Sequence, residues 1–398
     1  MLKILLILSL AISLLTAVSI NELVNNTNEK NYDLKSVEKS IEMANQQINL
    51  SKNWQNPMLS FGINDLWLND LSSQNKEAMQ ASFIGISQVI PMGDKLEIKE
   101  HMAIKDKNIQ IYTLENKKLQ LESKVYEYVY NLLLLEEKYK LLDSYEQNIN
   151  KLESLFNSLY KYQKATQNDI LNTQISSFEL TLQKQNLKNM IDTFYIKLEQ
   201  ITYMKIDKID EEININKIDN FLDNSAHPSF KILEENANKS KDKAALELAK
   251  KIPDIQVNIA YFQRDDKFND YVNLSLSFPL AIYKTEDTAR LQAMINTNET
   301  NDRLEQLKHN FSLEINILKN TLNSAYLNYN LIAQKIIPLK QKIQKNIESY
   351  NSFDKVKASE SIKNLNELIA YETKAIDELQ KYYEAYSSLI YYTNKGIK

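Results

Sequence analysis

The sequence predicts a mainly α-helical chain with a small β part, in which long coiled-coil helical hairpins alternate with four short strands. Turn-forming residues are scarce, since the 398 residues include only 4 Gly and 6 Pro, far below the usual share. No Gly or Pro lies between Asp94 and His227, and only Pro338 interrupts the stretch from Leu280 to Lys395. The remaining breakers gather in two windows where apolar residues recur at every second position.

Composition excludes several classes of protein and site. Cys is absent, which excludes disulfides, thiolate metal ligands and Cys nucleophiles, and 3 His leave little for a His-based metal site. A net charge of −4 with only 3 Arg argues against nucleic-acid binding and bidentate phosphate clamps. A mean hydropathy of −0.44 with 25% charged residues excludes a polytopic helical membrane protein. No carboxylate pair, nucleophile or phosphate loop stands out, so we expect no enzyme, no catalytic or metal site and no cofactor.

Residues 1–19 are expected to form a secretory signal peptide. Lys3 provides a short positive region, an apolar run follows from Ile4 to Leu15, and small residues stand at Ala17 and Ser19. The apolar run is shorter than the ~20 residues needed to span a bilayer. The alternative is a buried N-terminal helix. No Cys follows the expected cleavage site, so we expect no lipid on the N-terminus.

Two long segments have the 3-4 apolar spacing of coiled coils, which predicts knobs-into-holes packing. The first seam comprises Leu121, Val125, Tyr128, Leu132, Leu135, Tyr139, Leu142, Tyr145, Ile149, Leu152, Phe156 and Leu159. The second comprises Ile315, Leu318, Leu322, Ala325, Tyr329, Ile332, Ile336, Leu339 and Ile343. Tyr145 follows its predecessor by three residues instead of four, a local stammer. Pro338 predicts a helix break or a kink, because proline lacks a backbone donor.

Each breaker-rich window predicts a strand, a polar loop and a returning strand. Apolar and polar residues alternate in Leu59 to Ile63, in Ile255 to Tyr261 and in Val272 to Phe278, and Met79 to Ile90 forms the remaining strand. Strands with one apolar face fit a transmembrane β-barrel, whereas the alternative is a soluble hairpin packed on a core. Four strands cannot close a barrel, which takes about eight. The chain is therefore expected to share a barrel with identical copies.

Aromatic residues flank the predicted strands and favour the barrel, because amphipathic rings prefer membrane interfaces. The interface candidates are Trp54, Trp67, Tyr261, Phe262, Tyr271 and Tyr283.

The order of helix, hairpin and long helices occurs twice, which predicts an internal two-fold repeat. Ser87–Pro91 matches Ser275–Pro279, and Asn168–Leu171 matches Asn366–Ile369. The expected domains after the signal peptide are an N-terminal helix (20–56), hairpin 1 (57–91), helical hairpin 1 (92–227), a second-repeat helix (228–252), hairpin 2 (253–283), and helical hairpin 2 with the C-terminus (284–398).

In these features the sequence resembles the outer membrane efflux protein (TolC) family. The marks of this resemblance are Asn56-Pro57, Gln88-Val89-Ile90-Pro91, His227-Pro228, Ser277-Phe278-Pro279-Leu280, and the helical segments that contain Asp169 and Glu367. The resemblance implies a homotrimer with a twelve-stranded barrel in outer-membrane lipid and a long helical tunnel (α-barrel) in the periplasm. It also implies two partners, a periplasmic adaptor (membrane fusion) protein and an inner-membrane pump of the RND or ABC type.

The same resemblance places Glu367 and Asp169 near the periplasmic constriction as gating candidates. The alternative for Glu367 is an ordinary solvated helix carboxylate, and for Asp169 a helix cap or a tip-surface role. The candidates for contact with the adaptor or pump are Gln163, Lys164, Ala165, Thr166, Lys357 and Ser359, and the alternative for these is a plain inter-helix turn.

The expected function is a passive exit duct of a tripartite efflux or type I secretion system, located in the outer membrane with a periplasmic extension. The alternative is a secreted periplasmic structural coiled coil without a pore. An enzyme is the weakest interpretation, since the sequence contains no recognisable site.

Overall fold

The computed structural model describes residues 17–67, 69, 76–218, 226–349 and 355–393, so the expected signal peptide lies outside the described residues up to residue 16. The helices are α1 (Ile20–Lys30), α2 (Tyr32–Ser51), α3 (Lys95–Lys161), α4 (Gln167–Thr202), α5 (Pro228–Ala249), α6 (Thr285–Leu331), α7 (Ile337–Ser349) and α8 (Lys355–Thr393), with a π-helical turn η1 (Ile332–Ile336). The strands are β1 (Met58–Asn64), β2 (Ala81–Ile90), β3 (Ile255–Gln263) and β4 (Tyr271–Ser277). The predicted combination of long helices and four strands is confirmed.

The chain divides into two compact units. The sheet unit consists of residues 36–115 and 228–308, and the helical unit consists of residues 1–35, 116–227 and 309–398. The order helix, strand pair, long helix, second helix occurs in α2–β1–β2–α3–α4 and again in α5–β3–β4–α6/α7–α8. The predicted two-fold repeat is therefore present in the order of the elements.

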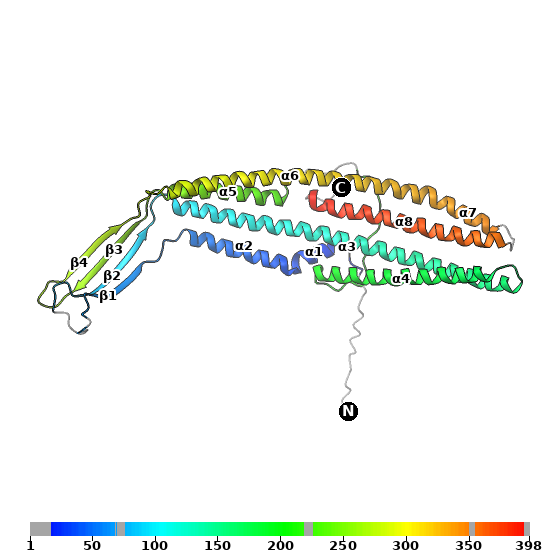
Figure 1. The fold of residues 1–398 in the computed structure, drawn as a ribbon, viewed down its shortest axis with the longest axis horizontal. Helices are drawn as coiled ribbons and strands as arrows, with labels where there is room; N and C mark the ends of the chain where they lie inside the picture. Colours follow the sequence, from blue (N-terminus) through cyan, green and yellow to red (C-terminus); the bar gives the residue numbers. More distant parts are fainter. Residues whose placement is uncertain (1–16, 68, 70–75, 219–225, 350–354, 394–398) are drawn as a thin grey trace, which may run out of the picture. The chain divides into compact units, whose positions relative to one another are not determined.

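In the sheet unit the four strands lie side by side in the order β1-β2-β3-β4, all antiparallel (Figure 1). The central pairing of β2 with β3 joins the two repeats, with Ile84 opposite Tyr261 and Ile90 opposite Ile255. Prolines bound three of the strands, because proline cannot donate a ladder hydrogen bond: Pro91 follows β2, Pro253 precedes β3 and Pro279 follows β4.

In the helical unit the first predicted seam is confirmed. Of its residues on α3, Leu142, Tyr145, Ile149 and Phe156 are buried, and no member of the seam is exposed. Tyr145 is buried despite its three-residue step, so the helix absorbs the stammer without losing the seam. Leu142, Tyr145 and Ile149 pack in one apolar cluster with residues of α4 and α8, and Phe156 packs in a second cluster nearer the α3–α4 turn.

The second predicted seam is confirmed only as far as Ile336; the assignment of Leu339 and Ile343 to it is wrong. Both side chains are exposed, at 60% and 43%, and Gln344 is buried instead. The cause is η1, because a π-helical turn accommodates one extra residue and shifts every later position around the helix. The helix does not break at Pro338 but passes through the π turn and continues as α7.

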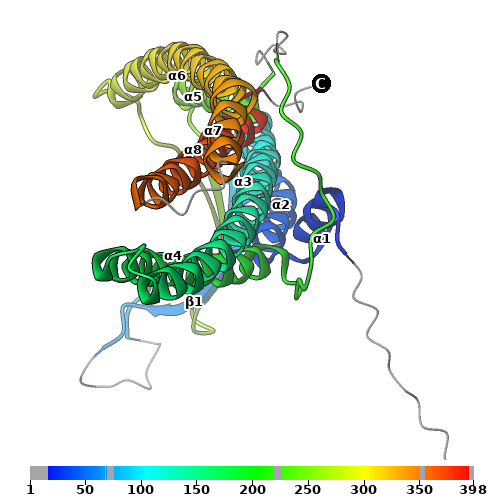
Figure 2. The ribbon, with the colours of Figure 1, turned by 90° about the vertical axis from the view of Figure 1, so that its right-hand side faces the viewer.

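The segment after α4 ties the ends of the helical unit together. It runs past α1 (Figure 2) and forms a parallel bridge between Ile209 and Val18. The Tyr383 hydroxyl of α8 donates to the Asn214 carbonyl at 2.7 Å, so the same segment also holds the end of α8. None of the described helices is long and apolar enough to cross a membrane.

Candidate membrane-spanning sheet and helical tips

The middle of the sheet has one face that is apolar from edge strand to edge strand. Directly paired residues of antiparallel strands lie on the same face, so Phe61, Ile84, Tyr261 and Val272 form one row across the sheet. The apolar members of this face are Leu59, Phe61, Ile63, Ile84, Ile86, Ile90, Ile255, Val257, Ile259, Tyr261, Val272, Leu274 and Leu276, and its polar members, Ser82, Gln88 and Gln263, lie toward the two ends of the strands. Phe61 is 81% exposed and Leu274 is 64% exposed in the single chain. An apolar face of this extent requires a cover of lipid or protein.

The opposite face carries small and polar side chains. It comprises Ser60, Gly62, Asn64, Ala81, Gly85, Ser87, Gln256, Asn258, Ala260, Asn273, Ser275 and Ser277, with an aromatic group of Phe83, Phe262 and Tyr271 at the loop end and the apolar Met58 and Val89 at the other end. No Asp, Glu, Lys or Arg occurs in any of the four strands. A sheet with one apolar and one polar, uncharged face suits lipid on one side and water on the other.

Both edges of the sheet are open within the described residues. β1 pairs only with β2, and β4 pairs only with β3. The outer N–H and C=O groups of these two strands therefore lack a strand partner in the part of the chain that the structure describes. In lipid each unpaired backbone group costs several kcal/mol, so the sheet requires further strands at both edges.

The six predicted interface aromatics occupy different positions around the sheet. Three are exposed beyond the strand ends: Trp54, Trp67 and Tyr283. Tyr261 lies on the apolar face, and its hydroxyl donates to the Asp270 carboxylate. Phe262 and Tyr271 lie instead on the polar face, where their rings stack with centroids 4.7 Å apart.

A buried lysine connects the helix ends to the sheet. Lys95, the first residue of α3, is 5% exposed, and its Nζ donates to Asp254 Oδ1 at 2.6 Å and to the Ile252 carbonyl. The backbone N–H of Met92 donates to the same Asp254 oxygen at 3.0 Å. The chain leaving β2 is thus fastened to the chain entering β3. Sequence analysis missed this contact, because neither repeat alone contains both partners.

The turn between α3 and α4 contains the first group of predicted contact residues. Gln163, Lys164 and Thr166 are exposed, whereas Ala165 is buried at 5% and packs in a small apolar cluster. Gln163 has a φ of 60°, the left-handed conformation that often closes a helix. The turn forms without Gly because Gln163 adopts this conformation and a helix cap at Thr166 stabilises the start of α4.

Asp169 forms that cap. Its carboxylate accepts from the Thr166 backbone N–H at 2.8 Å, while the Thr166 hydroxyl accepts from the Asp169 N–H at 3.2 Å. This reciprocal arrangement is a capping box at the start of α4. The structure therefore shows the helix-capping alternative for Asp169 directly.

Glu367 lies on α8 and forms an ion pair with Lys340 of α7. The hydrogen bond and the positive charge of Lys340 hold the pKa of the Glu367 carboxyl below its ordinary value. Lys357 and Ser359 are in the first turns of α8, and their side chains are outside the described part of the structure. Glu367 therefore connects α7 and α8 through this ion pair.

Three buried polar side chains lie in the α7–α8 seam, and sequence analysis did not predict them. Gln344 Nε2 donates to Ser361 Oγ at 2.9 Å, and Asn364 Nδ2 donates to Gln344 Oε1 at 2.9 Å. All three are at most 8% exposed. The heptad pattern placed Ile343 in this position, and the π turn shifts Gln344 into it instead.

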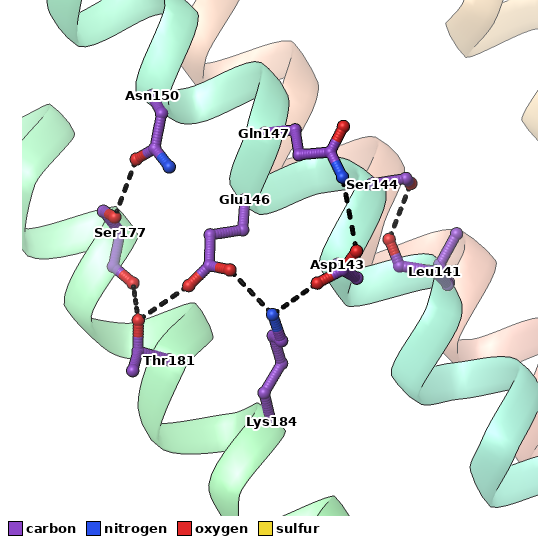
Figure 3. A network of polar contacts seen from close by, with 9 residues as sticks. All are labelled: Leu141, Asp143, Ser144, Glu146, Gln147, Asn150, Ser177, Thr181 and Lys184. Atoms are coloured by element: carbon purple, nitrogen blue, oxygen red, sulfur yellow. Dashed lines mark hydrogen bonds and ion pairs between the residues drawn. The ribbon is translucent and has the colours of Figure 1, made fainter.

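The α3–α4 pair has its polar contacts beside an apolar seam instead (Figure 3). Lys184 of α4 lies between Asp143 and Glu146 of α3, with N–O distances of 2.6 and 2.7 Å. Thr181 also donates to Glu146 at 2.8 Å. Hydrogen bonds from Lys184 lower the pKa values of both carboxyls, and the two carboxylates raise the pKa of Lys184.

Comparisons with known proteins identify the fold. No protein-family model matches the chain, and no curated protein matches it in sequence. Among solved structures, the CmeC outer membrane channel of Campylobacter jejuni superposes with a TM-score of 0.78 at 13% identity, over 95% of this chain and 86% of CmeC. The chain has the fold of an outer membrane channel.

Further solved structures agree. The open state of the MtrE outer membrane channel of Neisseria gonorrhoeae has a TM-score of 0.77 at 11% identity, covering 95% of this chain and 89% of MtrE. The outer membrane protein VceC of Vibrio cholerae has a TM-score of 0.74 at 10% identity, covering 95% of this chain and 97% of VceC. The resemblance predicted from the sequence is confirmed at the level of the fold.

Proposed function

We propose that this protein is the outer-membrane exit channel of a tripartite efflux or type I secretion system. The observation that carries the proposal is the charge-free, two-faced sheet with two open edges, in a chain that has the fold of an outer membrane channel. Its apolar face would contact lipid and its polar face would line a water-filled bore. Transport is passive, and the chain performs no chemistry of its own.

The proposal requires a homotrimer, since three chains supply the strands of a twelve-stranded barrel. Two exposed apolar stripes on the helical unit support assembly with identical copies. One lies on α4 and comprises Leu171, Ile175, Phe178 and Leu182; the other crosses the π turn and comprises Leu327, Leu331, Leu339 and Ile343. The π turn keeps the second stripe continuous, because it rotates Leu339 and Ile343 out of the seam and into line with Leu327 and Leu331.

In this assembly, hairpins 57–91 and 253–283 lie in the outer membrane and helical hairpins 92–227 and 284–398 extend into the periplasm. The tips of the helical hairpins are the surfaces offered to a periplasmic adaptor and an inner-membrane pump. Gln163, Lys164 and Thr166 support such contact because they are exposed in the α3–α4 turn. Glu367 is the gating candidate that we retain, because it joins two helices through an ion pair.

A pair of adjacent residues tests the proposal. Leu274 lies on the apolar face and Asn273 on the polar face of the same strand. A charge on the lipid-facing side of a barrel costs about 2–4 kcal/mol at the membrane midplane. Leu274→Lys should therefore reduce recovery of the protein in the outer-membrane fraction, and Asn273→Lys should not. The purified parent and the Asn273→Lys variant should also form conducting trimers in planar lipid bilayers.

Two results would overturn the proposal. Equal loss of outer-membrane recovery in both variants would mean that the sheet does not distinguish lipid from water. A parent that is water-soluble and produces no conductance would favour the pore-free structural coiled coil.

A further inference from the structure

The polar face of the sheet has bulky aromatic rings at a single level. Phe83, Phe262 and Tyr271 are directly paired across β2, β3 and β4 at the end of the sheet where the strands meet their loops. Their ring centroids are 5.3 Å apart for Phe83–Phe262 and 4.7 Å apart for Phe262–Tyr271. No other aromatic side chain lies on this face of the described strands. We call these three residues the aromatic row.

The aromatic row also covers β1, because β1 has a glycine, Gly62, at this level. Gly62 of β1 is paired with Phe83, and a Cβ at Gly62 would lie 2.8 Å from Phe83 Cε1. The Phe83 ring therefore covers Gly62, an arrangement that any larger residue would obstruct. The aromatic row thus crosses all four strands of the chain.

A loop arginine holds the other end of the row. The Arg264 guanidinium lies 5.2 Å from the centroid of the Tyr271 ring, a cation–π distance. Arg264 Nη1 also donates to the Ala78 carbonyl at 3.1 Å, and its Nε donates to the Asn269 carbonyl at 2.7 Å. These contacts join the loops of both hairpins and fix the ring of Tyr271.

The stacking occupies the ring faces, so the row forms a wall rather than an open binding surface. Phe262 has neighbours on both sides and is 9% exposed, and Tyr271 at the end of the row is 37% exposed. Elsewhere the polar face carries mostly Ser, Asn, Ala, Gly and Gln side chains, and the strands carry no charge. If this face lines a bore, the rings narrow the bore at this level, and the Arg264 guanidinium lies beside them on Tyr271.

We propose that the aromatic row is a size-limiting constriction at the loop end of the channel, where it sorts solutes by cross-section. This inference rests on the proposed function, which makes the polar face the lining of the bore. In a closed barrel of identical copies the row is repeated in every chain and forms a ring around the bore. Narrow solutes pass, and wider ones are excluded.

Planar-bilayer recordings with uncharged polyethylene glycols of increasing size test the constriction. Simultaneous replacement of Phe83, Phe262 and Tyr271 by Ala should raise single-channel conductance and shift the polymer size cut-off upward. Phe61→Ala is the control on the lipid-facing side, and Asn273→Ala is the control on the lining away from the row; neither should move the cut-off.

The outcomes separate this inference from the proposed function. A parent without conductance overturns both. A conducting parent whose cut-off is the same in the triple variant overturns the constriction alone. If the triple variant fails to insert, the single variant Tyr271→Ala decides, since Tyr271 is the most exposed of the three rings and its loss leaves the Phe83–Phe262 contact in place. An upward shift then supports the constriction, and an unchanged cut-off rejects it.

Discussion

The two helical hairpins of the helical unit are held together by different chemistry. The seam between α3 and α4 is apolar, and its ion pairs around Lys184 lie beside it. The seam between α7 and α8 contains buried Gln344, Ser361 and Asn364, next to the Lys340–Glu367 pair. Apolar seams are strong but tolerate small shifts of register, whereas buried polar pairs lose free energy as soon as a partner is displaced. The α7–α8 hairpin therefore has its register fixed by direction-dependent contacts.

The largest effect is expected in the apolar seam. Phe156 is 1% exposed, and replacing a buried Phe by Ala usually costs about 3–5 kcal/mol. Phe156→Ala should lower the free energy of unfolding by this amount, measured by urea denaturation followed by circular dichroism in detergent. The neighbouring Leu155 is 43% exposed, so Leu155→Ala should cost no more than about 1 kcal/mol. Equal effects would mean that the seam is not the main source of stability in this hairpin.

A smaller effect is expected in the polar seam, and it should be reversible by further mutation. Gln344→Ala removes the partner of Ser361 and of Asn364, which should cost about 1–3 kcal/mol. The triple variant Gln344→Leu, Ser361→Ala, Asn364→Leu removes all three polar groups together and should recover most of that loss. The same urea denaturation measures both variants. A triple variant less stable than the single one would show that packing, and not hydrogen bonding, dominates here.

The π turn gives a third test. If η1 is one inserted residue, deleting Ala333 should restore an ordinary helix and leave Lys340 and Gln344 facing α8. The free energy of unfolding should then change by less than about 1 kcal/mol. Deleting Ser324, an exposed residue of α6 outside the turn, removes the same number of atoms from the backbone but rotates the seam. It should therefore destabilise the chain much more, and equal losses would contradict the insertion model.

The smallest effect concerns pH and the Lys340–Glu367 pair. Lys340 keeps the folded-state pKa of Glu367 below that of the unfolded chain, which is about 4.3 for a free Glu. The pair therefore contributes stability at pH values above the unfolded pKa, and this contribution disappears as the pH falls through the folded pKa. At pH 7 the parent should be slightly more stable than Glu367→Gln, and the difference should vanish in strong acid. A difference that grows on acidification would contradict this assignment.

The elements that depend on local pattern were predictable from the sequence. The α3 seam follows from its 3-4 apolar spacing, and the strands follow from the alternation of apolar and polar residues between Gly and Pro residues. In both cases the apolar pattern within a single element indicates which of its faces is buried. The π turn was not predictable, since it adds one residue to a helix without a sequence signature beyond the nearby Pro338. Leu339 and Ile343 were therefore placed in the wrong seam.

The same distinction applies to the candidate site. The apolar face of the sheet could be predicted from single strands, but the aromatic row could not, because it depends on the register between β2, β3 and β4. Phe262 and Tyr271 were predicted as interface aromatics, yet their faces are decided by pairing partners far away in the sequence. Asp169 illustrates a third case: its carboxylate has a local partner, Thr166, and helix capping was one of the alternatives expected for it.

Lys95 makes the two halves of the repeat mechanically inseparable. A duplicated chain with one hairpin in each half would be expected to behave as two independent modules. The Lys95 amine at the start of α3 instead donates hydrogen bonds to Ile252 and Asp254, which precede β3. A rotation of α3 about its axis would therefore also displace the second repeat. Cleavage of the polypeptide between the repeats would leave Lys95 in one fragment and its acceptors, Ile252 and Asp254, in the other.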